Sequence, residues 1–104
     1  MSTQLMVRYR VKADRAAENE ALVRDVFAAL ERDGPSGIRY ATFKLTDGVS
    51  FVHLARIDTA DGANPLLAVD AFQRFVATIR DRCEEPPVST ELREVGAYPR
   101  GSHP

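Results

Sequence analysis

The sequence predicts an α+β domain with the element order β-α-β-β-α-β, in which two helices cover one face of a four-stranded antiparallel sheet. Three observations lead to this prediction. Apolar and polar side chains alternate along residues 5–12, as they do in a strand with one buried face. Apolar side chains recur at helical spacing over residues 14–34 and again over residues 70–83. Between these segments, residues 39–57 alternate on both sides of Asp47-Gly48, a pair typical of a β-hairpin turn.

The first strand, "LMVRYRVK" at residues 5–12, sorts its side chains into two sets. Successive side chains of a strand point to opposite faces, so one set of alternate residues should be buried. The set expected to be buried is Leu5, Val7, Tyr9 and Val11. The opposite set, expected on the other face, is Met6, Arg8, Arg10 and Lys12.

The first helix is predicted to have Asp14 as its N-cap and to stop at Gly34-Pro35. Its apolar stripe consists of Leu22, Val23, Val26, Phe27 and Leu30. Asn19 lies one turn before this stripe. We interpret Asn19 as a boundary residue satisfied by local hydrogen bonds, and a contact to a ligand is the alternative.

The hairpin should have a type I′ turn, which needs positive φ at both Asp47 and Gly48. This turn sets a register in which Thr42 faces His53, and opposed residues share a face. One face then holds Ala41, Phe43, Leu45, Val52 and Leu54, and the other holds Tyr40, Thr42, Lys44, Phe51, His53 and Ala55. Because the first face is purely apolar, we expect it to pack against the helices and the second face to point away from them.

The second half of the chain repeats the helix-then-strand pattern. Asn64 is predicted to cap a short turn, and Asp70 with Gln73 resembles a capping box for the second helix. The apolar stripe of this helix ends at Cys83, and the prolines of "EEPP" end the helix itself. The last strand is predicted over residues 88–95.

This order of elements defines an architecture. Right-handed crossovers place both helices on one face of the sheet and give the strand order 4-1-3-2. Residues 1–98 are expected to form a single ferredoxin-like domain, and residues 99–104 a flexible tail. Within the tail, "PRGSH" resembles a cloning remnant, so His103 receives no role. The bare sheet face would expose aromatic side chains, so we expect a second copy of the chain to cover it in a homodimer.

Composition excludes several functional classes. The formal net charge of −1 and the pI near 6.1 lack the basic excess of a nucleic-acid-binding protein. No apolar run approaches the ~18 residues of a membrane span, and residues 1–10 lack a signal-peptide pattern. Cys83 is the single cysteine and cannot form an internal disulfide, which favours the cytoplasm. No metal site is expected from one cysteine and one usable histidine.

His53 is the leading candidate for a functional residue. In a dimer with facing sheets, its predicted face would line the interior, opposite Thr42 and near Tyr40 and Phe51. A histidine there could act as a general base or hold a substrate oxygen, and the two aromatic residues could wall a pocket. The alternatives are a hydrogen-bonded interior histidine without a catalytic task, and aromatic side chains that only pack at the interface.

A second candidate group combines Arg8 and Arg10 of the first strand with Glu91 and Arg93 of the last strand. We expect these four side chains on one face of adjacent strands. The arginines could anchor an anion or a carboxylate. The alternative is an ion-pair network with Glu91 at the subunit contact.

The element order over roughly residues 4–98 resembles the dimeric α+β barrel superfamily. The resemblance is carried by the hairpin "FKLTDGVSFVHLARI", the "NPL" that opens the second helical segment, and the two phenylalanines of the following helix. The best-known members of this superfamily are antibiotic-biosynthesis-type monooxygenases. The segments "ENEALVRDVF", "DGVSFVHLA" and "CEEPPVSTELREVGAY" are also similar to small bacterial proteins of this fold without an assigned activity.

The resemblance implies a dimeric barrel and an enzyme that needs no cofactor. In such monooxygenases, an electron-rich phenol or quinol is deprotonated and itself reacts with oxygen. The resemblance implies that Tyr40, His53 and one of Arg8 or Arg10 would serve this chemistry here. The haem-degrading relatives use a tryptophan and a helix histidine, whereas this chain has no Trp and its histidine lies on a strand.

Three functions are therefore compared. The first is a cofactor-independent, monooxygenase-like enzyme acting on a small aromatic or quinol-type compound. Its candidate catalytic residues are His53 and Tyr40, and its candidate substrate-binding residues are Arg8, Arg10, Thr42, Phe51 and Arg93. The alternative is a non-catalytic homodimer that binds a small molecule or a partner. An RNA-recognition module shares the element order, but the negative net charge argues against it.

Overall fold

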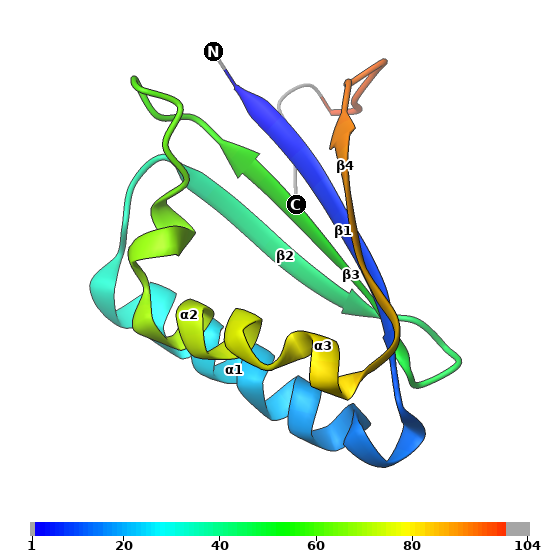
Figure 1. Cartoon of the computed structure of the whole chain (residues 1–104). Helices are drawn as coiled ribbons and strands as arrows, with labels where there is room; N and C mark the ends of the chain where they lie inside the picture. Colours follow the sequence, from blue (N-terminus) through cyan, green and yellow to red (C-terminus); the bar gives the residue numbers. More distant parts are fainter. Residues whose placement is uncertain (1, 100–104) are drawn as a thin grey trace.

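The computed structural model describes residues 2–99, and these form one sheet with helices on one face (Figure 1). The elements are β1 (Thr3–Val11), η1 (Ala13–Arg15), α1 (Ala16–Asp33), β2 (Ile38–Lys44), β3 (Ser50–Ile57), η2 (Pro65–Ala68), α2 (Asp70–Ala77), α3 (Ile79–Arg82) and β4 (Cys83–Leu92). The sheet is antiparallel with the order β2-β3-β1-β4, which confirms the predicted strand order and fold class. The predicted flexible tail at residues 99–104 lies, apart from Pro99, outside the described residues.

The core lies between the sheet and the helices. β1 contributes Tyr9 and Val11, which are almost fully buried, as the alternation of residues 5–12 predicts. α1 contributes Val23, Val26 and Ala29 from its apolar stripe, and the second helical segment contributes Ala71, Phe75 and Ile79. Burial of these apolar side chains is the main force that holds the helices on the sheet.

The predicted faces of the hairpin are wrong, although its register is correct. β2 and β3 pair with Thr42 opposite His53, as expected. However, β3 also pairs with β1, and this places His53 beside Val7 and Phe51 beside Tyr9 on the helix-covered face. The face that points away carries Ala41, Phe43, Val52 and Leu54. The prediction chose the buried face by its apolar content. The pairing partner decides instead, because β3 must share the buried face of its neighbour β1. The polar groups of His53 can be buried on that face because they are hydrogen-bonded.

The hairpin turn also differs from the predicted type I′ geometry. Of the two turn residues Asp47 and Gly48, only Gly48 has a positive φ, of 78°, so Asp47 does not adopt the left-handed conformation. The Gly48 N–H donates to the Leu45 carbonyl oxygen at 3.0 Å. The Asp47 carboxylate accepts hydrogen bonds from the Val49 and Ser50 N–H groups and from the Ser50 hydroxyl at 2.6–2.9 Å. The Asp47 side chain therefore holds the turn by an Asx-type motif.

The helix ends are partly as predicted. Gly34 ends α1 with φ 57°, and Asn64 caps η2 by accepting the Leu66 N–H at 3.0 Å. Asp14 does not cap α1, which begins after η1 without a side-chain cap. The predicted capping box at Asp70 is also wrong, because the Gln73 side chain donates to the Leu67 carbonyl oxygen instead.

The last strand begins at Cys83 rather than at residue 88, and it ends at Leu92. Cys83 is therefore the first residue of β4 and not the end of a helix. The helix before it is interrupted at Thr78 into α2 and α3. The prolines of "EEPP" lie inside β4, which is tolerated because β4 is an edge strand of the sheet. The register between β1 and β4 shifts on both sides of Arg10.

Candidate ligand-binding site around His53

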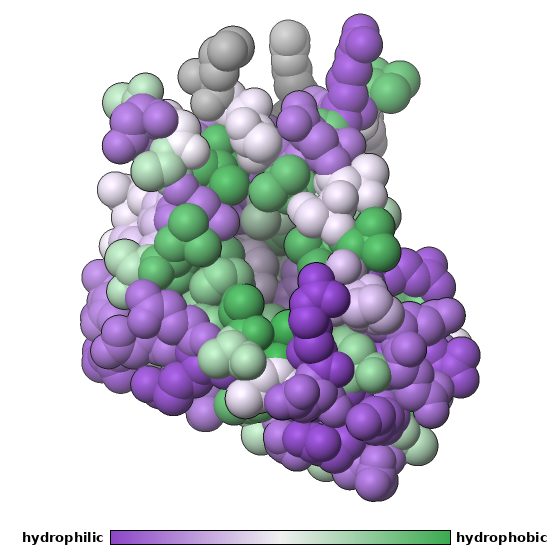
Figure 2. Space-filling model, in the orientation of Figure 1, coloured by the Kyte–Doolittle hydropathy of each residue, from purple (hydrophilic) through white to green (hydrophobic). Residues whose placement is uncertain are grey.

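A small cavity of about 180 Å³ lies between the sheet and the second helical segment. Its lining is mostly apolar and comes from β1, β2, β3, η2, α2, α3 and β4: Leu5, Val7, Tyr9, Tyr40, His53, Ala55, Asn64, Leu66, Phe72, Phe75, Val76, Ile79 and Pro87. Figure 2 shows hydrophobic side chains gathered in the middle of the molecule, above the hydrophilic surface of the helices. An apolar cavity of roughly 150 Å³ is large enough to hold one benzene ring.

His53 lies at the wall of this cavity and is only 4% exposed. Its Nε2 lies 2.8 Å from the Tyr9 hydroxyl oxygen. Its Nδ1 lies 2.5 Å from the Tyr40 hydroxyl oxygen and 2.9 Å from Oγ1 of Thr42. Burial lowers the pKa of His53 to about 4, so the ring is neutral at pH 7. Both ring nitrogens are thus engaged by protein hydroxyl groups.

The hydrogen bonds continue from Tyr9 to a buried arginine. Asn19 of α1 donates from Nδ2 to the Tyr9 hydroxyl oxygen at 2.9 Å, and its Oδ1 accepts from Nε of Arg82 at 3.0 Å. Arg82 is fully buried and also donates to Oγ1 of Thr78 and to the Phe75 carbonyl oxygen. Its guanidinium lies over the Phe75 ring, 5.2 Å from the ring centroid. The charge is therefore solvated by neutral acceptors and a ring face.

The tyrosine hydroxyl groups of the site remain protonated. Burial raises the pKa of Tyr40 to about 12, and a hydrogen bond with Thr42 partly opposes this rise. Burial also raises the pKa of Tyr9 well above its ordinary value. Neither tyrosine is a base at neutral pH, so both act as neutral hydrogen-bonding groups.

Aromatic packing fixes the rings of the site. Phe51 stacks on Tyr9 with ring centroids 5.6 Å apart and an interplanar angle of 12°. Phe27 of α1 stacks on Tyr40 at 5.3 Å, and Phe72 meets Tyr40 edge-on at 6.5 Å. Rings held on both sides in this way keep their hydroxyl groups at defined positions.

The structure brings together four of the residues predicted for the site, but not on the predicted face. His53, Tyr40 and Thr42 share hydrogen bonds, and Phe51 packs beneath Tyr9. They lie under the helices because β3 shares the inner face of β1. The cavity beside these residues lies inside the single chain, under the helices.

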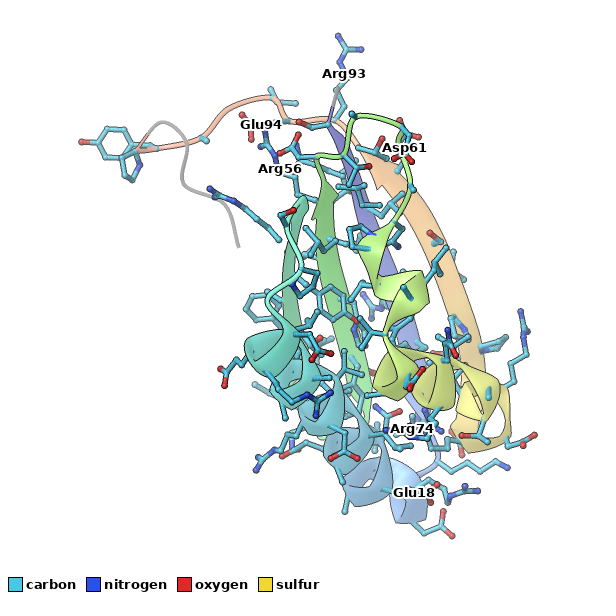
Figure 3. All side chains as sticks on the ribbon, turned by 90° about the vertical axis from the view of Figure 1, so that its left-hand side faces the viewer. Glu18, Arg56, Asp61, Arg74, Arg93 and Glu94 are labelled. Carbon is cyan, nitrogen blue, oxygen red and sulfur yellow. The ribbon has the colours of Figure 1, made fainter. Side chains whose placement is uncertain are left out.

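The predicted arginines lie elsewhere. Arg8 pairs with Val52 and Val88 on the open face. Nε of Arg10 lies 3.6 Å from Oε2 of Glu84. Arg93 follows the end of β4 and points away from the sheet, at the end opposite the helices (Figure 3). Glu91 pairs with Leu5 and so lies on the opposite face from Arg8, which makes the predicted common face of this group wrong.

Sequence reasoning missed the roles of Tyr9 and Arg82 and the place of Asn64 at the cavity, and it interpreted Asn19 as a residue with local hydrogen bonds, with a ligand contact as the alternative. For Asn19 and Arg82, the helical spacing of the sequence indicates a buried position. Asn19 precedes Val23 and Val26 at intervals of four and seven, and Arg82 follows Phe75 by seven and Ile79 by three. Both polar residues thus occupy core positions of otherwise apolar stripes. Polar residues at such positions are buried with partners, and these two are partners of each other.

Among residues 2–99, no group of three or more His, Cys, Asp or Glu side chains is placed to hold a metal ion. The same part of the chain contains no helix that is long and apolar enough to cross a membrane. The site consists of neutral hydroxyl, amide and imidazole groups beside an apolar cavity, and the buried guanidinium of Arg82 lies behind these groups.

Solved structures share this fold at low sequence identity. Rv0793 from Mycobacterium tuberculosis aligns with a TM-score of 0.75 and 15% identity, covering 94% of this chain and 99% of that chain. A Nitrosomonas europaea protein, provisionally named an antibiotic biosynthesis monooxygenase, gives a TM-score of 0.74 at 20% identity, covering 96% and 94%. SnoaB from Streptomyces nogalater, described as a cofactor-independent oxygenase and solved as a mutant, gives 0.69 at 19% identity, covering 94% and 97%.

No family model and no curated protein matches the sequence. The structural likeness confirms the α+β ferredoxin-like fold that the sequence predicted, and this fold is shared with proteins named as monooxygenases or oxygenases. At these identities the likeness is evidence for the fold, and an activity has to be argued from the site.

Proposed function

We propose that the chain binds a small phenol- or quinol-type compound in the cavity beside His53 and promotes its reaction with oxygen without a cofactor. The observation that carries this proposal is the Tyr40–His53 pair at the wall of an otherwise apolar cavity of about 180 Å³. An apolar cavity with few polar groups favours a ring that bears one oxygen substituent. The cavity volume favours a single-ring compound over a polycyclic one.

Two polar groups are available to hold the ligand oxygen. Tyr40 lines the cavity, and its hydroxyl group is supported by His53 and Thr42. Asn64 also lines the cavity, and the Leu66 N–H fixes its Oδ1, so its amide nitrogen is the group left to donate. We assign the contact with the ligand to Tyr40, and we assign to His53 the orientation of Tyr40.

The proposed reaction converts an electron-rich phenol with a free para position into a quinone. One atom of O₂ enters the ring at that position and the other leaves as water, while the two displaced hydrogens of the substrate end up in that water. The substrate thus supplies all the electrons. The protein contributes binding, exclusion of water and stabilisation of the substrate oxygen.

The test has two stages. Binding of substituted phenols and methoxyphenols is measured by calorimetry, and oxygen consumption and quinone formation are then followed with the compounds that bind. Tyr40→Phe should weaken binding and lower turnover, while Thr46→Val in the exposed hairpin turn should leave both unchanged. Failure of every phenol to bind would refute the proposal.

The second candidate is a non-catalytic protein that uses the same cavity to bind an aromatic compound. It is favoured by the engagement of both nitrogens of His53, which leaves no free ring nitrogen to act as a base. Tight binding without oxygen consumption for any bound phenol would select this candidate. Reproducible turnover that Tyr40→Phe lowers would exclude it.

We also propose a homodimer through the open face of the sheet. Phe43, Val52, Arg8 and Val88 form one row across this face, and Ala41, Leu54, Met6 and Thr90 form the next row. Phe43 is 50% exposed and Val88 is 62% exposed in the single chain. Large apolar side chains exposed on a sheet face in this way favour a self-complementary contact with a second copy. Native mass spectrometry measures the stoichiometry directly, and a monomer at all concentrations would refute this assembly.

A further inference from the structure

We propose that Arg82 and Asn19 are positioning residues that make Tyr40 a hydrogen-bond donor toward an anionic oxygen in the cavity. The ligand class that this arrangement favours is a phenol or enol bound as its anion. The inference rests on the proposed function, because it assumes that the cavity holds an aromatic oxygen compound. It goes beyond that function by assigning the residues of this chain that select the anion of the ligand.

The first step is the orientation of the Asn19 amide. Arg82 carries only hydrogen-bond donors, and its Nε lies 3.0 Å from Asn19. The atom of Asn19 that faces Arg82 must therefore be the oxygen. The amide nitrogen then faces Tyr9, and it donates to the hydroxyl oxygen of that residue at 2.9 Å.

The second step is the direction of the Tyr9 hydroxyl. Because Asn19 donates to its oxygen, the single hydrogen of Tyr9 is left for its other partner, Nε2 of His53 at 2.8 Å. Nε2 is therefore the acceptor nitrogen of a neutral imidazole. The ring proton must then be on Nδ1.

The third step leads into the cavity. The proton on Nδ1 is directed at the Tyr40 hydroxyl oxygen at 2.5 Å, with Oγ1 of Thr42 as the more distant partner at 2.9 Å. Tyr40 accepts from His53, and the Thr42 hydroxyl group donates in its hydrogen bond with Tyr40, so the hydrogen of Tyr40 itself is available for a ligand. Tyr40 lines the cavity, so this hydrogen is the last donor in the series of hydrogen bonds that begins at Arg82.

Every donor in this series of hydrogen bonds points toward the cavity, and the positive charge of Arg82 lies at the far end of the series. Among residues 2–99, no carboxylate forms a salt bridge with Arg82, and the carboxylate whose charge acts on it, Glu18 of α1, is itself paired with Arg15. Chains of hydrogen bonds with one common direction polarise each other and strengthen the terminal bond. A hydrogen bond to a charged acceptor is in turn stronger than one to a neutral acceptor. The Tyr40 end of the chain therefore favours a phenolate or enolate oxygen over the neutral hydroxyl group.

The binding test uses 4-nitrophenol, whose anion and neutral form have different absorption spectra. Spectra of the bound probe at a series of pH values give the ratio of the two affinities. We expect the wild type to prefer the anion by about tenfold. Tyr40→Phe should abolish this preference. Equal affinity for both forms in the wild type would overturn the inference.

Variants of the buried arginine test the positioning role. Arg82→Met should lower the preference for the anion several-fold with little change in affinity for the neutral probe, and Arg82→Lys should restore part of it. The matched control is Arg80→Met, an exposed arginine on the same helix α3, which should behave as the wild type. If Arg82→Met does not fold, Tyr9→Phe interrupts the same chain with the loss of one oxygen atom. An unchanged preference in these folded variants would contradict the inference.

The position of the His53 ring proton, measured without ligand, tests the direction of these hydrogen bonds. Nitrogen NMR of histidine-labelled wild-type protein, assigned with a His53→Gln sample, should show the proton of His53 on Nδ1. A proton on Nε2 would reverse the direction of the hydrogen bond between Tyr9 and His53, and it would overturn the inference. The two failures are distinguishable: a protein that binds no phenol but has the Nδ1 proton refutes the proposed function, whereas binding without anion preference refutes only the present inference.

Discussion

The Tyr40 hydroxyl oxygen lies 2.5 Å from Nδ1 of His53, so the histidine reaches the cavity through a tyrosine and not through a free ring nitrogen. Tyr9 occupies the other nitrogen at 2.8 Å. His53 is consequently a core residue, and in the proposed site it supports Tyr40. A His53→Ala variant would leave two buried hydroxyl groups without a partner and open a cavity, so its loss of binding could not be assigned to chemistry alone.

The buried histidine should make the stability of the protein depend on pH. Burial lowers the pKa of His53 to about 4 in the folded protein, whereas an unfolded histidine has a pKa of about 6.5. Between these values the unfolded chain binds a proton that the folded chain does not. The free energy of unfolding should therefore fall as the pH decreases below about 6.5, by up to ~1.4 kcal/mol per pH unit. Urea unfolding between about pH 5 and about pH 7 measures this slope, in a range above the titration of most carboxylates.

Two substitutions identify the histidine responsible. In His53→Gln the slope between about pH 5 and about pH 7 should be nearly flat. His103→Gln replaces the other histidine of the chain and should retain the wild-type slope. A slope that persists in His53→Gln would show that another group carries the pH dependence.

Asp47 should be more important for stability than its exposed position suggests. Its carboxylate accepts two backbone N–H groups and the Ser50 hydroxyl, and these hydrogen bonds lower its pKa to about 2. Asp47→Ala should lower the melting temperature by several degrees, because the hairpin turn loses all three bonds. Asp61→Ala is the matched control, since Asp61 accepts one backbone N–H, from Ala63, in another exposed loop. Equal melting temperatures for the two variants would contradict this account of the turn.

The open sheet face should determine the oligomeric state. Phe43→Asp replaces an exposed aromatic side chain of that face by a charged one and should shift a homodimer toward monomer by at least tenfold in its dissociation constant. Leu67→Asp is the comparison, because Leu67 is 63% exposed but belongs to η2 on the helix side. Analytical ultracentrifugation of both variants measures the dissociation constants. Weakening of the dimer by Leu67→Asp alone would place the contact on the other side of the molecule.

Two glycines with similar backbone angles should differ in their tolerance of a side chain. Gly48 has φ +78° and open space around its missing Cβ, so Gly48→Ala should cost about 1 kcal/mol from backbone strain. Gly37 has φ +82°, and a Cβ there would lie 2.7 Å from Cγ2 of Thr59. Gly37→Ala should therefore be the more destabilising variant in denaturant unfolding. Adding Thr59→Ser, which removes that methyl group, should recover part of the difference, and no recovery would point to strain alone.

The hydrophobic periods of this sequence were sufficient for the fold. Alternation along β1, helical spacing in α1 and the turn signal at Asp47-Gly48 predicted the element order, the strand order and the pairing of Thr42 with His53. These are local properties, because side-chain periods and turn residues act within a few positions of the chain. The single histidine of the hairpin and its tyrosine neighbour were identified in the same way.

The face of the hairpin, and with it the place of the site, was decided only by the tertiary structure. Both faces of residues 39–57 contain enough apolar side chains to pack against a helix, so the local pattern does not choose between them. Pairing with β1 makes the choice, because it places His53 beside Val7 and under Phe75. Burial of the histidine then depends on Tyr9 and Tyr40 as partners, and burial of Arg82 depends on Asn19, which is 63 residues away in the sequence. Hydrogen bonds between such distant residues leave no periodic trace in a single sequence, which is why the folded chain was needed to find the site.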